Sequence, residues 1–475
     1  MLSKSFISWV IHGFPRLLKN MRALEIINGN IITGDGETVL EKSSVIVRNE
    51  RITEIVRTDF PPYAPVDRII NACDGYVIPG VVNLHAHGVT LGPFAGIFKP
   101  PFQLVVGIMN RHLIQGETTV LSVDGTNTVW ECEAASNTHP LNVKTATIHT
   151  PSNIKLWESY SMGIKVLEKK HKEASAEDMI RLGAVAIGEV GAPGFPYGLH
   201  IQRRIPSLKN VDYGQAKAIK LALFGRVYSF DPLTFDEVRI KKILQEIELA
   251  DAATMDEMKM VRDEIVDGYA TMKKGLLEAG ELAKRMNVPV ISHHSPENTE
   301  PVHKLACQIG PLLVASHSNH LYEPEEAVEA ARRLKKAGAH IDVYSGDSFG
   351  ARKLLPSPET TFALLKEDLV DSCSTDYCGG YWDPILLVME KAIEQRIISL
   401  PRAIAIASGA AKLVPLLAPN RGMITPGRIA DIVIVDRDHI SKVKTVIISG
   451  RIVVDDGKLV APFRYDEVGF LSPTI

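Results

Sequence analysis

The stretch GVVNLHAHG, residues 80–88, carries the strongest local signal in the chain. It has the pattern of a short apolar β-strand that ends in two histidines, His85 and His87. Because successive side chains of a strand point to opposite faces, residues two apart project to the same side. The stretch therefore predicts a buried strand with two imidazoles at its C-terminal end.

Seven more apolar segments follow, and amphipathic helical segments separate them. This alternation is typical of a parallel sheet with helical crossovers. Eight is also the strand number of the TIM barrel, so the predicted fold class is α/β, with a TIM-like (β/α)8 barrel. The eight candidate strands are GVVNLHAH (80–87), TTVLSVDG (118–125), VKTATIHT (143–150), AVAIGEVG (184–191), VPVISHH (288–294), GPLLVASHS (310–318), HIDVYSG (340–346) and LVDSCSTDY (369–377).

Both ends of the chain are rich in short strands broken by turn residues. Residues 23–57 show this pattern, and ADIVIVD (430–436) and VKTVIISG (443–450) repeat it. Strand-rich ends around a barrel predict that the two ends meet in one composite β-sandwich. The predicted domains are an N-terminal extension over residues 1–20, the sandwich from residues 21–77 and 420–475, and the barrel over residues 78–419.

A charged helical insertion at about residues 198–268 separates the fourth and fifth predicted strands. An insertion that follows a barrel strand lies on the same face as the C-terminal strand ends. Two interpretations stay open: a lid or subunit contact over that face, or a solvated helical excursion without a catalytic part.

The composition is that of a globular protein, with 45% apolar and 23% charged residues and a net charge of −3. This charge gives no reason to expect a nucleic acid or an anionic membrane as partner. The 5 scattered cysteines argue against a disulfide framework and favour a reducing cytoplasm. No stretch approaches the ~20 apolar residues that a membrane helix needs. We therefore expect a cytoplasmic protein with neither a nucleic acid nor a membrane as partner.

Five of the predicted strands end in residues of the kind that bind metal ions. One such residue alone is weak evidence, but five strand ends on one barrel face predict a site for zinc, manganese or iron. His294 directly follows His293, and alternation along a strand lets only one of them face the metal. The predicted ligands are His85, His87, Glu189, His293, His317 and Asp376.

The segments VIPGVVNLHAHG (77–88) and GMITPGRIADIVIVD (422–436), together with the order of these ligands, resemble the amidohydrolase superfamily. The resemblance implies a hydrolase that cleaves a C–N bond other than a peptide bond, in a cyclic amide or a related small molecule. It further implies a homo-oligomer. Members with two metals usually carry a carboxylated lysine on the fourth strand, and the glutamate Glu189 in its place is similar to enamidase.

The same resemblance favours His293 over His294, because the related pattern has its ligand directly after an apolar strand, and it implies a role for each ligand. His85, His87 and Asp376 would hold the more buried ion. His293 and His317 would hold a second ion, and Glu189 would bridge the two. Metal-activated water would attack the substrate, while Asp376 moves the proton to the leaving nitrogen.

Two alternative interpretations of the same residues stand beside the two-metal hydrolase. His294 and Glu297 form an HxxE pattern that resembles the deaminase branch of the superfamily, in which Glu297 would be the acid beside a single zinc ion. A non-catalytic assembly protein is a remote alternative, since no expected ligand is missing. Candidate substrate-binding residues are His149, at the end of the third strand, and Arg352, in the loop after the seventh.

Overall fold

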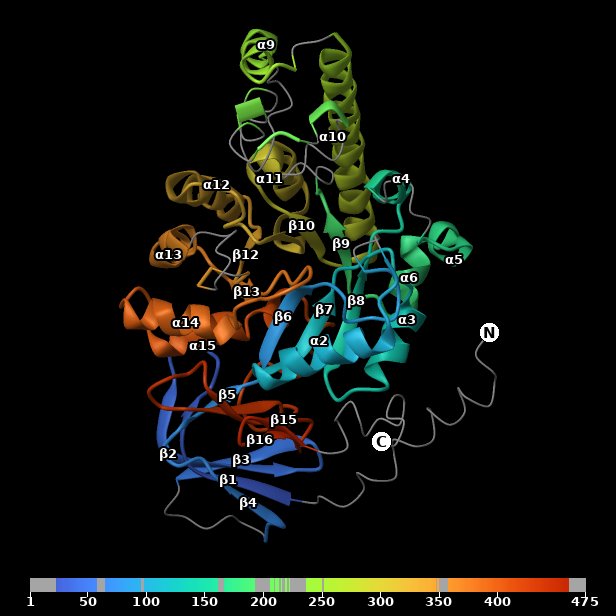
Figure 1. The fold of residues 1–475 in the computed structure, drawn as a ribbon. Helices are drawn as coiled ribbons and strands as arrows, with labels where there is room; N and C mark the ends of the chain where they lie inside the picture. Colours follow the sequence, from blue (N-terminus) through green and yellow to red (C-terminus); the bar gives the residue numbers. More distant parts are fainter. Residues whose placement is uncertain are drawn as a thin grey trace, which may run out of the picture.

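The computed structural model describes most of the chain, and Figure 1 places a barrel between a β-sheet domain and a projecting helical segment. The predicted extension over residues 1–20 lies outside the described residues. These residues are 23–57, 65–94, 98–160, 166–192, 236–249, 252–346, 348–349 and 358–460, with short pieces between 206 and 222.

Eight parallel strands form the barrel in the order in which they occur in the sequence, so the predicted α/β barrel is confirmed. The first and last strands meet near their C-terminal ends, where Ala86 and Tyr377 form a parallel bridge. Nearly every strand residue is buried, as expected for strands covered on both faces. The strands are β6 (Val81–Ala86), β7 (Glu117–Ser122), β8 (Asn142–Thr147), β9 (Ala186–Val190), β10 (Val290–His293), β11 (Leu313–Ser316), β12 (His340–Tyr344) and β13 (Ser372–Ser374).

Helices cover the outside of the barrel (Figure 1). In α12, Ala327, Ala331 and Leu334 are buried, basic residues occupy the last turn, and Gly338 follows with a φ of 86°. The helices around the barrel are α2 (Phe102–Ile114), α3 (Val129–Ser136), α4 (Pro151–Tyr160), α5 (Lys169–Glu173), α6 (Ala176–Leu182), α10 (Ala252–Met286), α11 (Thr299–Ile309), α12 (Pro324–Lys336), α13 (Pro358–Lys366), α14 (Ile385–Glu394), α15 (Leu400–Ala407) and α16 (Ala410–Leu413).

The two ends of the chain share one nine-stranded sheet, as predicted. The N-terminal strand β5 pairs antiparallel with the C-terminal strand β14, which joins the two ends. Only Gly80 separates β5 from β6, so the sheet is attached directly to the first barrel strand. Its strands are β1 (Ala23–Ile32), β2 (Val39–Arg48), β3 (Arg51–Arg57), β4 (Arg68–Asn71), β5 (Tyr76–Pro79), β14 (Ile432–Val435), β15 (Val443–Ile448), β16 (Arg451–Asp455) and β17 (Lys458–Leu459).

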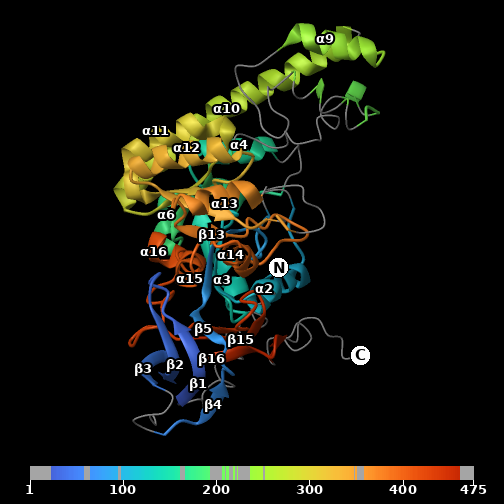
Figure 2. The same cartoon turned by 90° about the vertical axis from the view of Figure 1, so that its left-hand side faces the viewer.

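The described part of the insertion after β9 contains a short 3-10 turn, η1 (Pro206–Leu208), helix α9 (Glu237–Glu246) and the first turns of α10. Leu208, Ile240, Leu244 and Met258 are buried in a small apolar cluster of their own. Figures 1 and 2 show α9 and the start of α10 extending away from the barrel. Within the described ranges, the helices are all too short or too polar to cross a bilayer.

Candidate metal centre

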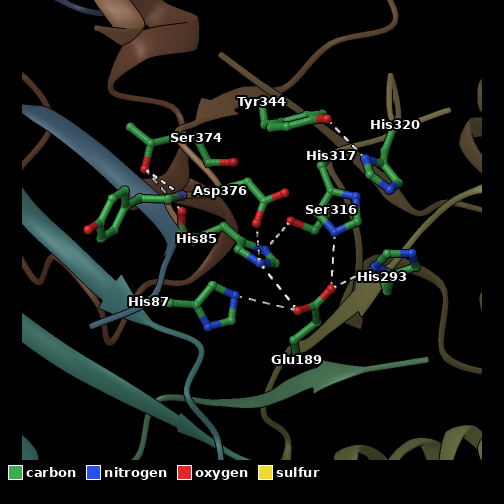
Figure 3. Close-up of polar contacts among 12 residues, drawn as sticks. His85, His87, Glu189, His293, Ser316, His317, His320, Tyr344, Ser374 and Asp376 are labelled. Carbon is green, nitrogen blue, oxygen red and sulfur yellow. Dashed lines mark hydrogen bonds and ion pairs between the residues drawn. The ribbon is translucent and has the colours of Figure 1, made fainter. Parts of the chain in front are cut away.

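The C-terminal ends of five barrel strands bring the six predicted ligands together (Figure 3). Parallel strands end on the same face of a barrel, so residues far apart in the sequence meet there. Strand β6 contains His85 and is followed by His87, β9 contains Glu189, and β10 ends in His293. His317 and Asp376 follow β11 and β13.

The carboxylate of Glu189 lies at the middle of the group, and its two oxygens face different pairs of imidazoles. Oε1 lies 2.9 Å from Nδ1 of His293 and 3.0 Å from Nε2 of His317. Oε2 lies 3.5 Å from Nε2 of His85 and 3.9 Å from Nε2 of His87. Burial alone would raise the pKa of Glu189, but His85 and the hydrogen bonds with His293 and His317 hold it well below its usual value.

Asp376 completes the side of the centre that holds His85. Its Oδ1 lies 3.4 Å from Nε2 of His85. That nitrogen is buried and has no hydrogen-bond partner among the described residues, although two carboxylates face it. The ligand atoms of His85, His87 and Asp376 lie within 4.8 Å of one another, as do those of His85, Glu189 and His317. An imidazole and carboxylate donor set of this kind fits zinc and similar divalent ions.

A buried carboxylate, Asp124, orients His87. It follows strand β7, and its Oδ1 lies 2.7 Å from Nδ1 of His87 while Oδ2 accepts the backbone N–H of Gly88. Burial lowers the pKa of His87, but Asp124 more than offsets this and raises it to about 9. With Nδ1 bonded to Asp124, Nε2 is the nitrogen left for the metal centre.

A second buried carboxylate, Asp342, lies close to His317 and, through Ser316, to His85. It accepts hydrogen bonds from the hydroxyls of Ser316, Ser372 and Ser374 and, at 3.3 Å, from the backbone N–H of His317. Burial raises its pKa to about 6, although the hydroxyls of Ser374 and Ser372 act to lower it. The sequence analysis included neither this residue nor Asp124 in the site.

Two of the ligands have strained backbone. His317 has a φ of 40° and Asp376 a φ of 46°, in the left-handed region that costs non-glycine residues free energy. Hydrogen bonds hold both residues in place: the N–H of Asp376 donates to the carbonyl of His85 at 3.0 Å, and the N–H of His317 donates to Asp342. Strain that the surroundings maintain is concentrated at functional sites.

Comparisons with known proteins agree with this architecture. No family model matches the chain. Dihydropyrimidinase 1 of Caenorhabditis briggsae is 24% identical, over 86% of this chain and 81% of its own. The structure of β-aspartyl dipeptidase from Fervidobacterium islandicum AW-1 matches with a TM-score of 0.56 and 15% identity, over 93% of this chain and 99% of its own. Dihydropyrimidinase from Brevibacillus agri NCHU1002 matches with a TM-score of 0.50 and 14% identity, over 92% and 96%.

The chain shares the fold of these proteins. In this barrel, His293 and not His294 lies at Glu189. His294 is fully buried, with Nδ1 2.9 Å from Oγ of Ser318 and Nε2 3.0 Å from the hydroxyl of Tyr322. Burial, with two histidines nearby, lowers the pKa of His294 to about 3. Both of its nitrogens are therefore engaged away from the metal centre.

The remaining candidate residues lie outside the group of six predicted ligands. His149 follows β8, and its Nδ1 lies 2.8 Å from Oγ1 of Thr147. Arg352 falls outside the described residues, so the substrate-binding roles of both stay predictions. Glu297 lies half-buried in a 3-10 turn, η2 (Pro296–Asn298).

His320 borders the centre beside His293 and His317. Its ring centroid lies 5.4 Å from that of His293 and 5.3 Å from that of His317. Its Nδ1 lies 2.9 Å from the hydroxyl of Tyr344 (Figure 3). The spacing HSNH at the end of the sixth strand was the available signal.

Proposed function

We propose that this protein is a metal-dependent hydrolase that cleaves a C–N bond in a cyclic amide or a related small molecule. One observation carries the proposal: the two oxygens of Glu189 face two separate imidazole pairs, with Asp376 beside the first pair. A carboxylate that presents one oxygen to each of two donor groups suits a bridge between two ions. The imidazole-rich donors favour zinc.

The chain's own residues would divide the work around such a centre. When bound, divalent ions lower the pKa of water and polarise a carbonyl group. The side chain of Asp376 is 19% exposed and that of Glu189 only 8%, so Asp376 is the carboxylate on the open side. We assign to Asp376 the transfer of a proton from the attacking water to the leaving nitrogen.

The names of similar proteins support the bond type. Two of the matched proteins are named dihydropyrimidinases, which are cyclic amidohydrolases, and another is named a β-aspartyl dipeptidase. Because function depends on the loops around a barrel more than on the barrel itself, the identity of the ring stays open to a substrate screen.

The test is the metal content of the purified protein, measured by elemental analysis beside a screen for ring opening of cyclic amides and imides. We expect about two zinc equivalents per chain in the wild type and one or fewer in Glu189→Ala, as a bridging ligand requires. Glu297→Gln is the control, since the proposal gives Glu297 no role. One equivalent in both the wild type and Glu189→Ala would defeat the two-metal site, and no bound metal would defeat the enzyme itself.

A further inference from the structure

Asp342 is a fully buried carboxylate in the middle of β12, and it does not contact the predicted ligand atoms directly. Its Oδ1 accepts from Oγ of Ser372 at 2.8 Å. Its Oδ2 accepts from Oγ of Ser374 at 2.7 Å and from Oγ of Ser316 at 3.2 Å. Together with the backbone N–H of His317, these hydroxyls surround the carboxylate with hydrogen-bond donors, so each hydroxyl points its hydrogen at Asp342.

This direction fixes the proton on His85. Oγ of Ser316 lies 2.6 Å from Nδ1 of His85. Because the hydroxyl hydrogen of Ser316 is already given to Asp342, its oxygen accepts from His85, and the imidazole hydrogen sits on Nδ1. The lone pair of His85 is then on Nε2, which faces Glu189 at 3.5 Å and Asp376 at 3.4 Å.

A lone pair between two carboxylates is unfavourable unless a cation joins them. Nε2 of His85 is buried and without a hydrogen-bond partner in the part of the chain that the structure describes. Leaving a buried polar atom unpaired costs free energy, which coordination of an ion would recover. The hydrogen-bonded series from Asp342 through Ser316 to His85 therefore leaves the lone pair on Nε2 of His85 available to bind a metal ion.

We propose that Ser316 and Asp342 are positioning residues that fix His85 in its metal-binding tautomer, and that the affinity for the first ion depends on them. This inference rests on the proposed function. Neither residue is one of the six predicted ligands, and both would act on the first ion through the imidazole of His85. Groups that orient a metal ligand typically contribute roughly tenfold to hundredfold in metal affinity.

The chain offers a matched control two residues further along. Ser318 is as fully buried as Ser316, and its Oγ also lies within hydrogen-bond distance of a histidine Nδ1, at 2.9 Å. That histidine is His294, whose other nitrogen bonds Tyr322. Ser316→Ala and Ser318→Ala thus remove the same group from the same type of contact, but only the first contact leads to a predicted ligand.

The experiment measures zinc affinity by competition with a chelator in the full chain, for the wild type, both alanine variants, Asp342→Asn and the double variant Ser316→Ala/Asp342→Asn. Thermal unfolding of the metal-free proteins reports whether each variant folds. We expect Ser316→Ala to weaken the tighter zinc site roughly tenfold to hundredfold, and Ser318→Ala to change it by less than about threefold. At the tighter site, the double variant should be no weaker than the weaker single variant, since Asp342 reaches His85 through the hydroxyl of Ser316.

The visible spectrum of the cobalt-substituted protein gives a second readout, because a purely structural role would not change the coordination of the first ion. A Ser316→Ala variant with wild-type zinc affinity, or equal losses in Ser316→Ala and Ser318→Ala, would overturn the inference while leaving the proposed function intact. A wild-type protein that binds no zinc would instead overturn the proposed function, and this inference with it.

Discussion

The candidate metal centre has two halves that differ in how firmly their histidines are held. In the first half, His85 and His87 each bond through the nitrogen away from the centre, to Ser316 and Asp124 respectively. In the second half, His317 is buried, yet its Nδ1 has no hydrogen-bond partner among the described residues. His293 is the more open of that pair, with 15% of its side chain exposed.

This difference predicts which of the two ions binds with the higher affinity. An imidazole that is already oriented loses little conformational freedom when it binds a metal, and its bonded nitrogen makes the other a better donor. The first half has both of these advantages, together with Asp376. We therefore expect the first ion to bind tightly and the second to exchange.

The largest effect is expected where the two halves meet. Glu189→Gln keeps the size of the side chain but removes the charge that both halves share, so it should weaken both sites. We expect at most one zinc equivalent and a loss of hydrolysis of more than about a hundredfold, beyond the range of groups that only orient a ligand. Elemental analysis and initial rates on a cyclic amide measure this. A variant with two tightly held ions would show that the halves do not share Glu189.

The next effect tests the first half alone. Asp124→Asn removes the charge that orients His87 and should weaken the tighter site roughly tenfold to hundredfold. The control is Glu131→Gln, which alters a similar buried pair in which Glu131 lies 3.1 Å from Nε2 of His171. This control should lower stability without changing zinc affinity. Equal zinc affinities in the wild type and Asp124→Asn would remove the proposed reason for the difference between the halves.

The sequence was sufficient to predict the barrel and to choose six residues that the structure brings together, because each of them carries a local signal. The pattern VVNLHAH contains both the strand and its pair of histidines. The supporting groups carry no such signal. Ser316 and His85 are 231 positions apart, and only the closed barrel brings them together. An aspartate inside a strand, such as Asp342, has many possible roles, and its partners decide which one it takes.

The same limit applies to the choice between His293 and His294 and to the insertion. Alternation along β10 showed only that one of the two histidines faces the site, and the resemblance favoured His293. The partners of His294, which are Ser318 and Tyr322, come from later in the chain. The helical character of the insertion was readable from its charge pattern, whereas its separate apolar cluster depends on contacts between η1, α9 and α10. Contacts of this kind are set by tertiary packing, which a sequence pattern alone does not contain.

A smaller effect should separate the halves in the wild-type protein. During slow dialysis against a chelator, the second ion should leave first, with an affinity at least about tenfold lower than that of the first, because only the first half has oriented imidazoles. Activity should decline as the second ion, which is the first to be released, is lost. Simultaneous loss of both equivalents would mean that the halves bind as one unit, with Glu189 dominating both.

The smallest effect is expected at Glu297, which belongs to neither half. It lies half-buried in η2, and the neighbouring His294 bonds Ser318 and Tyr322 instead of facing the metal centre. Glu297→Gln should therefore retain about two zinc equivalents and change hydrolysis by no more than about twofold, as substitutions away from a site do. The measurement is kcat and KM on a cyclic amide, beside ammonia release from an aminated heterocycle. A loss of activity of more than about a hundredfold with the metal retained would indicate that Glu297 is a catalytic acid. The deaminase mechanism would then replace the mechanism of a two-metal hydrolase.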